Sequence, residues 1–406
     1  MAEMEIPPYF LCPITLDIMK DPVTVSTGIT YDRDSIENWI FSLKRSTCPV
    51  TKQLLFDRDL TPNITLRRLI QAWCILHASQ GVERLPTPKA PTSKSQIIKL
   101  LNDANSPEMQ INCLQRLKSI SSQNQTNKRC METVGTAEFL AFLIVQKTLD
   151  LESESTQACE VALSILYSLQ LSESGMKSIS NQEFIESLTR IMQWGSYESR
   201  AYAVMLLESI LESADHPAQI VANINPQFFL QCTQILKDEI SQKATKATLK
   251  VLIKVCQYCG RNRIKVVEAG VVNLLIDLLL DYSDKRACEM MLVLLDFLCQ
   301  CAEGRAELLN HGAGLAIVSK KILWVSQVAS EKAVKILYSI SRFSATPLVL
   351  QEMLEIGVVA KLCLVLHADC GFKIKERIRE MLKLHSWAWR NSSCTPNNSI
   401  CSYSSR

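Results

Sequence analysis

The spacing of apolar residues changes about 90 residues into the chain. Before that point short apolar runs alternate with turn residues, whereas from about residue 94 onward apolar residues recur at every third or fourth position. The first pattern predicts a small α+β module and the second predicts consecutive amphipathic helices. We therefore divide the chain into an N-terminal module at residues 5–80, a linker at 81–93, a helical region at 94–390 and a tail at 391–406.

The linker and the tail differ in composition from the N-terminal module and the helical region. In the linker Pro86, Pro88 and Pro91 stand close together at spacings of two and three residues, which stops a helix and favours an extended spacer. The tail is mostly Ser, Asn, Thr and Cys without periodicity, so we predict that it is disordered.

The helical region contains an internal repeat. A Gly or polar residue followed by a short apolar helix returns six times, with phase marks at residues 135, 182, 225, 270, 312 and 357. The intervals of 47, 43, 45, 42 and 45 residues are typical of armadillo or HEAT units, which bury their apolar faces only against neighbouring units. The region resembles armadillo repeats, with a departure at the second and third marks, where the usual Gly is absent. This resemblance implies an all-α superhelix whose extended groove suits an elongated partner.

Turn residues and helical spacing predict a hairpin and two helices in the N-terminal module. An Asp-Pro and a Thr-Gly signal bracket the apolar run at residues 23–25, which predicts the hairpin. A helix is expected over residues 32–43, with Asp32 or Asp34 as its cap. The second helix is expected over residues 65–77, capped by its first residue, a threonine.

The same module contains two cysteines that resemble the first ligands of a zinc site, but it lacks the further ligands that would complete the site. Cys12 and Cys48 are each followed three positions later by a threonine, and no histidine precedes His77. Two soft ligands cannot close one tetrahedral site, so we predict that the module binds no zinc and that a polar network holds its loops instead. The side chains available for that network are Thr15, Asp17, Asp21, Thr24, Thr27, Thr30, Asp32, Arg33, Asp34, Glu37 and Thr51.

A series of short motifs identifies what the module resembles. The motifs occur in the order Cys12-Pro13-Ile14, Asp21-Pro22-Val23, Gly28-Ile29-Thr30-Tyr31-Asp32, Trp39, Cys48-Pro49-Val50-Thr51 and Pro62-Asn63. In this order they closely resemble a U-box over residues 7–73. The resemblance implies a mostly α chain, in which a small zinc-free, RING-like α+β U-box precedes the armadillo superhelix.

A U-box binds a ubiquitin-charged E2 enzyme in a shallow groove between two loops and a central helix. The resemblance assigns this groove to Ile14, Leu16, Trp39 and Pro49, and it assigns a second-loop contact with E2 and ubiquitin to Lys52. The alternatives are core packing for Ile14 and Trp39, a turn role for Pro49 and a solvated side chain for Lys52. No catalytic nucleophile is implied, because the reactive thioester is on the E2 and the ligase acts by positioning.

One helix of the repeat region carries a basic stripe. Lys243, Lys246, Lys250 and Lys254 are spaced by three or four residues and therefore share one helix face. In a concave groove this stripe would attract an acidic or phosphorylated substrate segment, whereas the alternative is an ordinary solvated face. Four tryptophans are expected to pack in the core or between repeats rather than to anchor a partner, namely Trp194, Trp324, Trp387 and Trp389.

Composition and charge narrow the function classes. The net charge of +3 gives no general attraction to nucleic acid, and no apolar run is long enough for an integral membrane segment. The acidic N-terminus is unlike a signal peptide, so we expect a cytoplasmic protein, with the nucleus also open, whose 16 cysteines stay reduced. The sequence contains no phosphate-binding loop and no metal-ligand spacing, so no cofactor is expected.

The pairing of the two regions carries the functional prediction. A U-box followed by armadillo repeats is similar to the plant U-box family. This resemblance implies an E3 ubiquitin ligase that binds E2, ubiquitin and a protein substrate, which the proteasome then degrades. The same resemblance implies a role in plant immune or stress signalling. Two alternatives are a non-catalytic armadillo adaptor with an inactive U-box and an importin-like carrier, and a homodimer through the U-box stays open.

Overall fold

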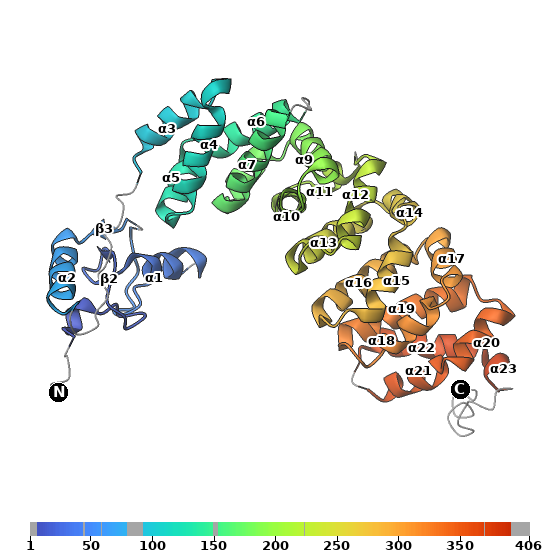
Figure 1. Cartoon of the computed structure of the whole chain (residues 1–406). Helices are drawn as coiled ribbons and strands as arrows, with labels where there is room; N and C mark the ends of the chain where they lie inside the picture. Colours follow the sequence, from blue (N-terminus) through green and yellow to red (C-terminus); the bar gives the residue numbers. More distant parts are fainter. Residues whose placement is uncertain are drawn as a thin grey trace. The chain divides into compact units, whose positions relative to one another are not determined.

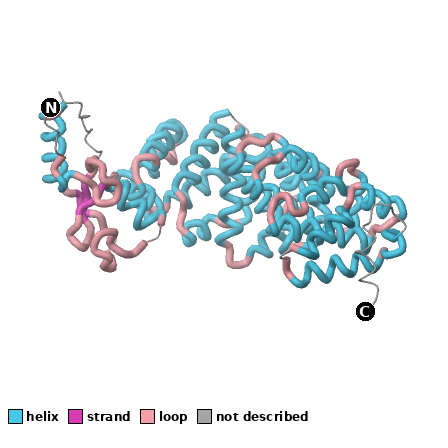
Figure 2. The backbone as a smooth tube through the Cα atoms, turned by 90° about the horizontal axis from the view of Figure 1, so that it is seen from below, coloured by secondary structure: helices cyan, strands magenta, loops and turns pink. Residues whose placement is uncertain are grey.

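The structure, a computed structural model, describes residues 6–43, 45–57, 59–78, 92–148, 153–222, 224–368 and 370–390. The chain divides into two compact units, one of residues 1–102 with 119–134 and the other of residues 103–118 with 135–406. Helices make up most of the described structure, and strands occur within it only in the N-terminal module (Figures 1 and 2). The predicted disordered tail and most of the predicted linker lie outside the described residues.

A three-stranded antiparallel sheet organises the N-terminal module. In the order β2-β1-β3, β1 is the central strand and Val23 lies opposite Tyr31 on one side and Pro62 on the other. The predicted hairpin is confirmed, whereas β3 is too short to leave a sequence pattern. The elements are η1 (Pro8–Phe10), β1 (Pro22–Thr24), β2 (Thr30–Asp32), α1 (Arg33–Glu37), the π-helical η2 (Asn38–Ser42), β3 (Thr61–Pro62) and α2 (Ile64–Leu76).

The predicted helix caps in this module are wrong. No side chain caps α1, because the Oδ1 atom of Asp32 instead accepts hydrogen bonds from the backbone N–H groups of Lys20 at 2.7 Å and Asp21 at 2.9 Å. Helix α2 begins one residue earlier than expected, and Asn63 caps it by accepting from the Leu66 N–H at 3.0 Å. In the first case a loop distant in sequence competes for the carboxylate, which a local pattern cannot reveal.

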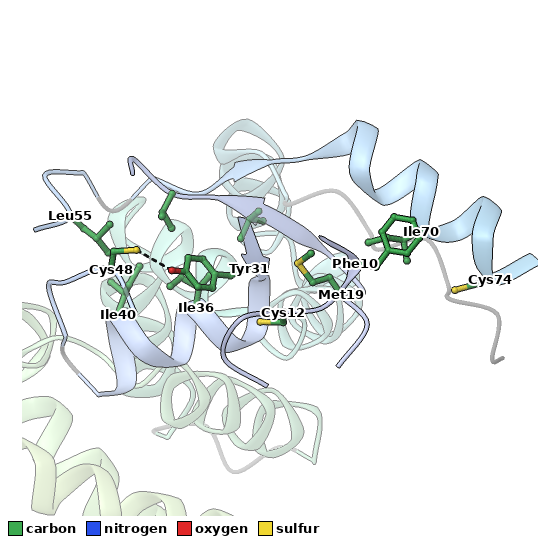
Figure 3. Packing of buried hydrophobic residues seen from close by; sticks show 12 residues of the cluster. Phe10, Cys12, Met19, Tyr31, Ile36, Ile40, Cys48, Leu55, Ile70 and Cys74 are labelled. Carbon is green, nitrogen blue, oxygen red and sulfur yellow. Dashed lines mark hydrogen bonds between the residues drawn. The ribbon is translucent and has the colours of Figure 1, made fainter. Parts of the chain in front are cut away.

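A single apolar core joins the sheet, the central helix and α2 (Figure 3). Tyr31 from β2 and Ile36 from α1 are fully buried, and Ile70 brings α2 into the same core. The core also contains Cys12 and Cys48, so the two predicted loops are fixed from inside the module. Its members are Phe10, Cys12, Met19, Val23, Val25, Tyr31, Ile36, Ile40, Cys48, Leu55, Ile70 and Cys74.

The remaining described chain is helical throughout, with helices that follow one another through short turns (Figure 1). These helices are α3 (Lys94–Asp103), α4 (Pro107–Ser121), α5 (Gln125–Thr133), α6 (Thr136–Lys147), α7 (Ser153–Leu169), α8 (Glu173–Ile179), α9 (Gln182–Trp194), α10 (Tyr197–Ser213), α11 (Pro217–Ala222), α12 (Pro226–Lys237), α13 (Gln242–Tyr258), α14 (Gly260–Glu268), α15 (Val271–Asp281), α16 (Lys285–Leu298), α17 (Ala302–Asn310), α18 (Gly314–Lys321), α19 (Gln327–Phe343), α20 (Pro347–Glu355), α21 (Val358–His367), α22 (Phe372–Leu384) and α23 (Ser386–Arg390). Within the second unit the long helices form one row, in which α7, α10, α13, α16, α19 and α22 each pack against the next.

The predicted repeat starts coincide with the starts of α6, α9, α12, α15, α18 and α21. Gly135, Gly270 and Gly357 precede their helices with φ angles of 83°, 79° and 73°, a left-handed conformation that favours glycine. At the two marks without glycine, Asn181 and Asn225 cap α9 and α12 by accepting from backbone N–H groups. At these two marks an asparagine cap therefore starts the helix in place of a left-handed glycine, and the period is confirmed.

Candidate functional site

Two loops of the N-terminal module repeat one design. In the first, the Cys12 N–H donates to the Asp17 carbonyl at 2.8 Å and Leu16 is left-handed with φ of 61°. In the second, the Cys48 N–H donates to the Gln53 carbonyl at 2.8 Å and Lys52 has the same φ of 61°. The sequence contains the signal for this likeness, since both loops read Cys-Pro, a β-branched residue and Thr before the left-handed position.

The two cysteine sulfurs serve as hydrogen-bond acceptors at the base of the loops. The Cys12 sulfur accepts from the Asp32 N–H at 3.3 Å, and the Cys48 sulfur accepts from the Thr27 hydroxyl at 3.3 Å. The Tyr31 hydroxyl lies 3.0 Å from the Cys48 sulfur (Figure 3) and itself accepts from the Val50 N–H at 3.2 Å, so its proton is free for the sulfur. Of these bonds, only the one from Thr27 uses a side chain of the predicted polar network, and the cysteine sulfurs and Tyr31 are not part of that prediction.

The thiols are electrostatically distinct from the other buried cysteines. Burial raises the pKa of Cys48, but hydrogen bonds from Thr27, Thr51 and Tyr31 outweigh it and lower the pKa to about 6. Burial likewise raises the pKa of Cys12, and backbone N–H groups lower it below its ordinary value. The described residues contain no cluster of His, Cys, Asp or Glu that could hold a metal ion.

We expect the stability of this module to fall as the pH is lowered through about 6. The folded-state pKa of Cys48 is depressed, so its thiolate contributes stability fully above the unfolded-state pKa near 9 and loses it as the pH falls through the folded-state value. Thermal unfolding of the wild type and of Cys48→Ala from pH 5.5 to 9 measures this, and the difference in melting temperature should widen with pH by an amount worth about 1–4 kcal/mol. A difference that stays constant over this range would contradict the assignment.

The predicted E2-groove residues lie on these loops and on the helix between them. Trp39 is half-buried on η2, and its indole Nε1–H donates to the Thr47 carbonyl at 2.7 Å, which joins the helix to the second loop. Ile14 and Pro49 are half-buried, whereas the left-handed Leu16 is 73% exposed. Ile14 and Trp39 pack against the core and still expose part of their surface, so core packing and a binding role coexist in them.

The ammonium group of Lys52 is turned back on its own loop. The side chain is exposed, and its Nζ donates to the Pro49 carbonyl at 2.8 Å. The structure thus brings Trp39, Pro49 and Lys52 together around the second loop, and it places Ile14 and Leu16 on the first. Sequence reasoning did not include Phe56, which follows the second loop and is 95% exposed.

The basic stripe of α13 is largely paired with acidic groups of neighbouring helices. Lys246 Nζ lies 2.6 Å from the Asp284 carboxylate before α16, and Lys250 binds Glu208 on α10. Lys254 lies 3.9 Å from Glu212. These pairs tie consecutive helices of the row together and offset the charge of Lys246, Lys250 and Lys254, whereas Lys243 is exposed.

The tryptophans of the repeat region fall into two groups. Trp389 is buried and Trp194 is half-buried, as predicted. Trp324 and Trp387 are 73% and 80% exposed, so the prediction that they pack inside is wrong. Trp324 stands in the turn between α18 and α19, and Trp387 stands in the short helix α23.

Comparison with known proteins matches both regions. Residues 6–79 match the U-box domain, and residues 95–405 match the plant U-box protein ARM repeat region. The chain is 56% identical to the Arabidopsis thaliana E3 ubiquitin-protein ligase PUB23, over 99% of this chain and 98% of that protein. It is 52% identical to the E3 ubiquitin-protein ligase PUB22 of the same plant, over 99% of both chains.

A solved structure supports the fold alone. The crystal structure of an engineered protein superposes with a TM-score of 0.50 at 16% identity, over 82% of this chain and 80% of that one. Together with the matched regions, this confirms a mostly α chain in which a small U-box precedes an all-α armadillo-repeat region. No helix of the described chain is long and apolar enough to cross a membrane. By these matches, the chain belongs to the plant U-box family and is related over its whole length to E3 ubiquitin-protein ligases.

Proposed function

We propose that this protein is an E3 ubiquitin ligase whose U-box, at residues 5–80, binds a ubiquitin-charged E2 enzyme between its two matching loops. The observation that carries the proposal is the anchoring of Trp39, which is held to the second loop by its indole N–H and keeps part of its ring exposed. A small apolar surface with polar surroundings suits a weak, exchangeable protein contact. The relatives named above support the activity, because they are ligases that match over their full length.

The U-box works by positioning rather than by covalent catalysis. Its three described thiols, Cys12, Cys48 and Cys74, are at most 1% exposed, so they cannot reach the thioester of a bound E2. Binding both E2 and ubiquitin restricts the thioester to orientations in which a lysine amine can attack. Lys52 contributes to that contact once its ammonium group leaves the Pro49 carbonyl.

The armadillo repeats, at residues 94–390, are proposed to bind the substrate. Stacked repeats leave an extended surface, and the exposed Lys243 beside the paired lysines of α13 gives that surface a site for an acidic side chain. Degradation of a signalling protein in plant immune or stress responses, in the cytoplasm or the nucleus, is the proposed context. The resemblance to the plant U-box family supports it.

An in vitro ubiquitination assay with E1, a panel of E2 enzymes, ubiquitin and ATP tests the ligase function. We expect chains with the wild type, and at least about fivefold fewer with Ile14→Ala, because truncating a groove residue removes about 1 kcal/mol or more of binding free energy. Leu69→Ala is the matched control, since this residue is exposed on α2 outside the groove. If the wild type forms no chains with any E2, the adaptor alternative replaces this proposal.

A further inference from the structure

The central helix of the U-box, formed by α1 and η2, has a third face that the E2 groove does not use, although Phe41 on this face also packs against the core. Ile36 and Ile40 point into the core, and Trp39 joins the second loop. Glu37 and Phe41, one helical turn apart, lie on the remaining face. This face meets α5, the helix that begins at residue 125.

Glu37 binds the N-terminus of α5 with both carboxylate oxygens. Its Oε2 accepts from the Gln125 N–H at 3.1 Å and its Oε1 accepts from the Thr126 hydroxyl at 2.5 Å. The first N–H groups of a helix have no partner within the helix, and the helix dipole favours a negative charge there. Glu37 is only 4% exposed, and Arg33 supports its charge at 3.6 Å.

A second contact lies one turn further along α5. The guanidinium carbon of Arg129 stands 3.0 Å from the centroid of the Phe41 ring, which is a cation–π arrangement. Beside the two contacts lies a cleft of about 580 Å³, which is lined by Phe41, strand β3 and α5. The attachment therefore depends on these two side-chain contacts rather than on a continuous apolar interface.

We propose that Glu37 and Phe41 clasp α5, so that the U-box and α5 move as one body and these two residues position the bound E2 for ubiquitin transfer. The prolines before α3 lie outside the described residues, and their sequence alone predicts an extended spacer, which would let the U-box reach lysines in many directions. The clasp restricts that freedom. Glu37 ends α1 and Trp39 stands on η2, which follows α1 directly, so α5 determines the direction in which the E2 thioester points. The clasp itself does not depend on ligase activity, whereas its effect on transfer rests on the proposed function.

Hydrogen exchange of the full-length chain tests the clasp. Thr126→Val removes the hydroxyl that donates to Glu37, whereas Thr126→Ser keeps it and is the matched control. We expect Thr126→Val to speed exchange of the amides of residues 33–41 by about tenfold, since a hydrogen bond to a charged group is lost, and Thr126→Ser to resemble the wild type. Faster exchange only within α5 would overturn the clasp.

A split between two transfer reactions tests the positioning role. In single-turnover assays with the E2 that gives most chains, discharge of ubiquitin to free lysine should be unchanged in Thr126→Val, because the E2 groove is intact. The set of lysines modified on the chain itself, mapped by mass spectrometry, should widen. If hydrogen exchange is faster but the set of modified lysines is unchanged, the positioning role is refuted. If discharge to free lysine and self-modification fall equally, Thr126 has only a structural role. If the wild type discharges ubiquitin from no E2, the proposed function is wrong, but the hydrogen-exchange result still tests the clasp.

Discussion

Replacing Arg33 by alanine is expected to unfold the U-box. The side chain is 7% exposed, and its Nε lies 2.6 Å from the Asp21 carboxylate while its Nη1 lies 3.6 Å from Glu37. Removal of Arg33 leaves the buried Glu37 without its cation and Asp21 with only the more distant Arg67, which costs about 3–5 kcal/mol. A core of this size supplies about 3–5 kcal/mol in total, so the loss consumes the whole stability of the module. Hydrogen exchange of residues 22–40 in the full-length chain measures it, and protection should be lost there while the repeats keep theirs.

Arg67 provides the matched control for this prediction. It also contacts Asp21, at 3.6 Å, but its side chain is 22% exposed, and Asp21 keeps Arg33 when Arg67 is removed. Arg67→Ala should therefore cost no more than about 1 kcal/mol and leave the U-box folded. Equal losses of protection in both variants would mean that the charge of Asp21, rather than the buried position of Arg33, decides the stability.

The features that a sequence pattern predicted are those set by neighbouring residues. The hairpin depends on local turn residues, and the repeat period depends on helix starts that recur in the chain. At these starts glycine and asparagine are alternatives, because Gly135 supplies a left-handed backbone while Asn181 supplies a side-chain acceptor. A search for glycine alone therefore loses two of the six starts, although the period survives.

The features that the pattern did not predict depend on residues distant in sequence. Asp32 has the chemistry of a helix cap, yet it binds the loop at Lys20 and Asp21. Lys246 and Lys250 form a basic stripe when one helix is considered alone, and their acidic partners come from helices about 40 residues away. Charge patterns on a repeat surface consequently need the neighbouring repeats before they indicate a ligand.

The five residues predicted to bind E2 illustrate both cases. The motif order of the U-box selected them as candidates, whereas it did not predict their hydrogen bonds and exposure. The hydrogen bonds from Trp39 to Thr47 and from Lys52 to Pro49 depend on the geometry of the second loop. The left-handed Lys52 near the end of this loop is indicated locally only by the repeated Cys-Pro motif. Trp39 therefore has two separable functions, because its indole N–H fixes the second loop and its ring offers apolar surface.

Two substitutions of Trp39 separate these functions. Trp39→Ala should lower E2 affinity by at least about 30-fold, since a central aromatic anchor is worth 2 kcal/mol or more. Trp39→Phe keeps an aromatic ring but loses the donor to the Thr47 carbonyl, and the loss of one hydrogen bond predicts only about a 3–10-fold decrease. Titration of each variant with an E2 enzyme by calorimetry measures the affinity, and circular dichroism verifies the fold. If both variants bind the E2 equally weakly, E2 binding depends on the hydrogen bond from Trp39 to the second loop rather than on apolar contact with the ring.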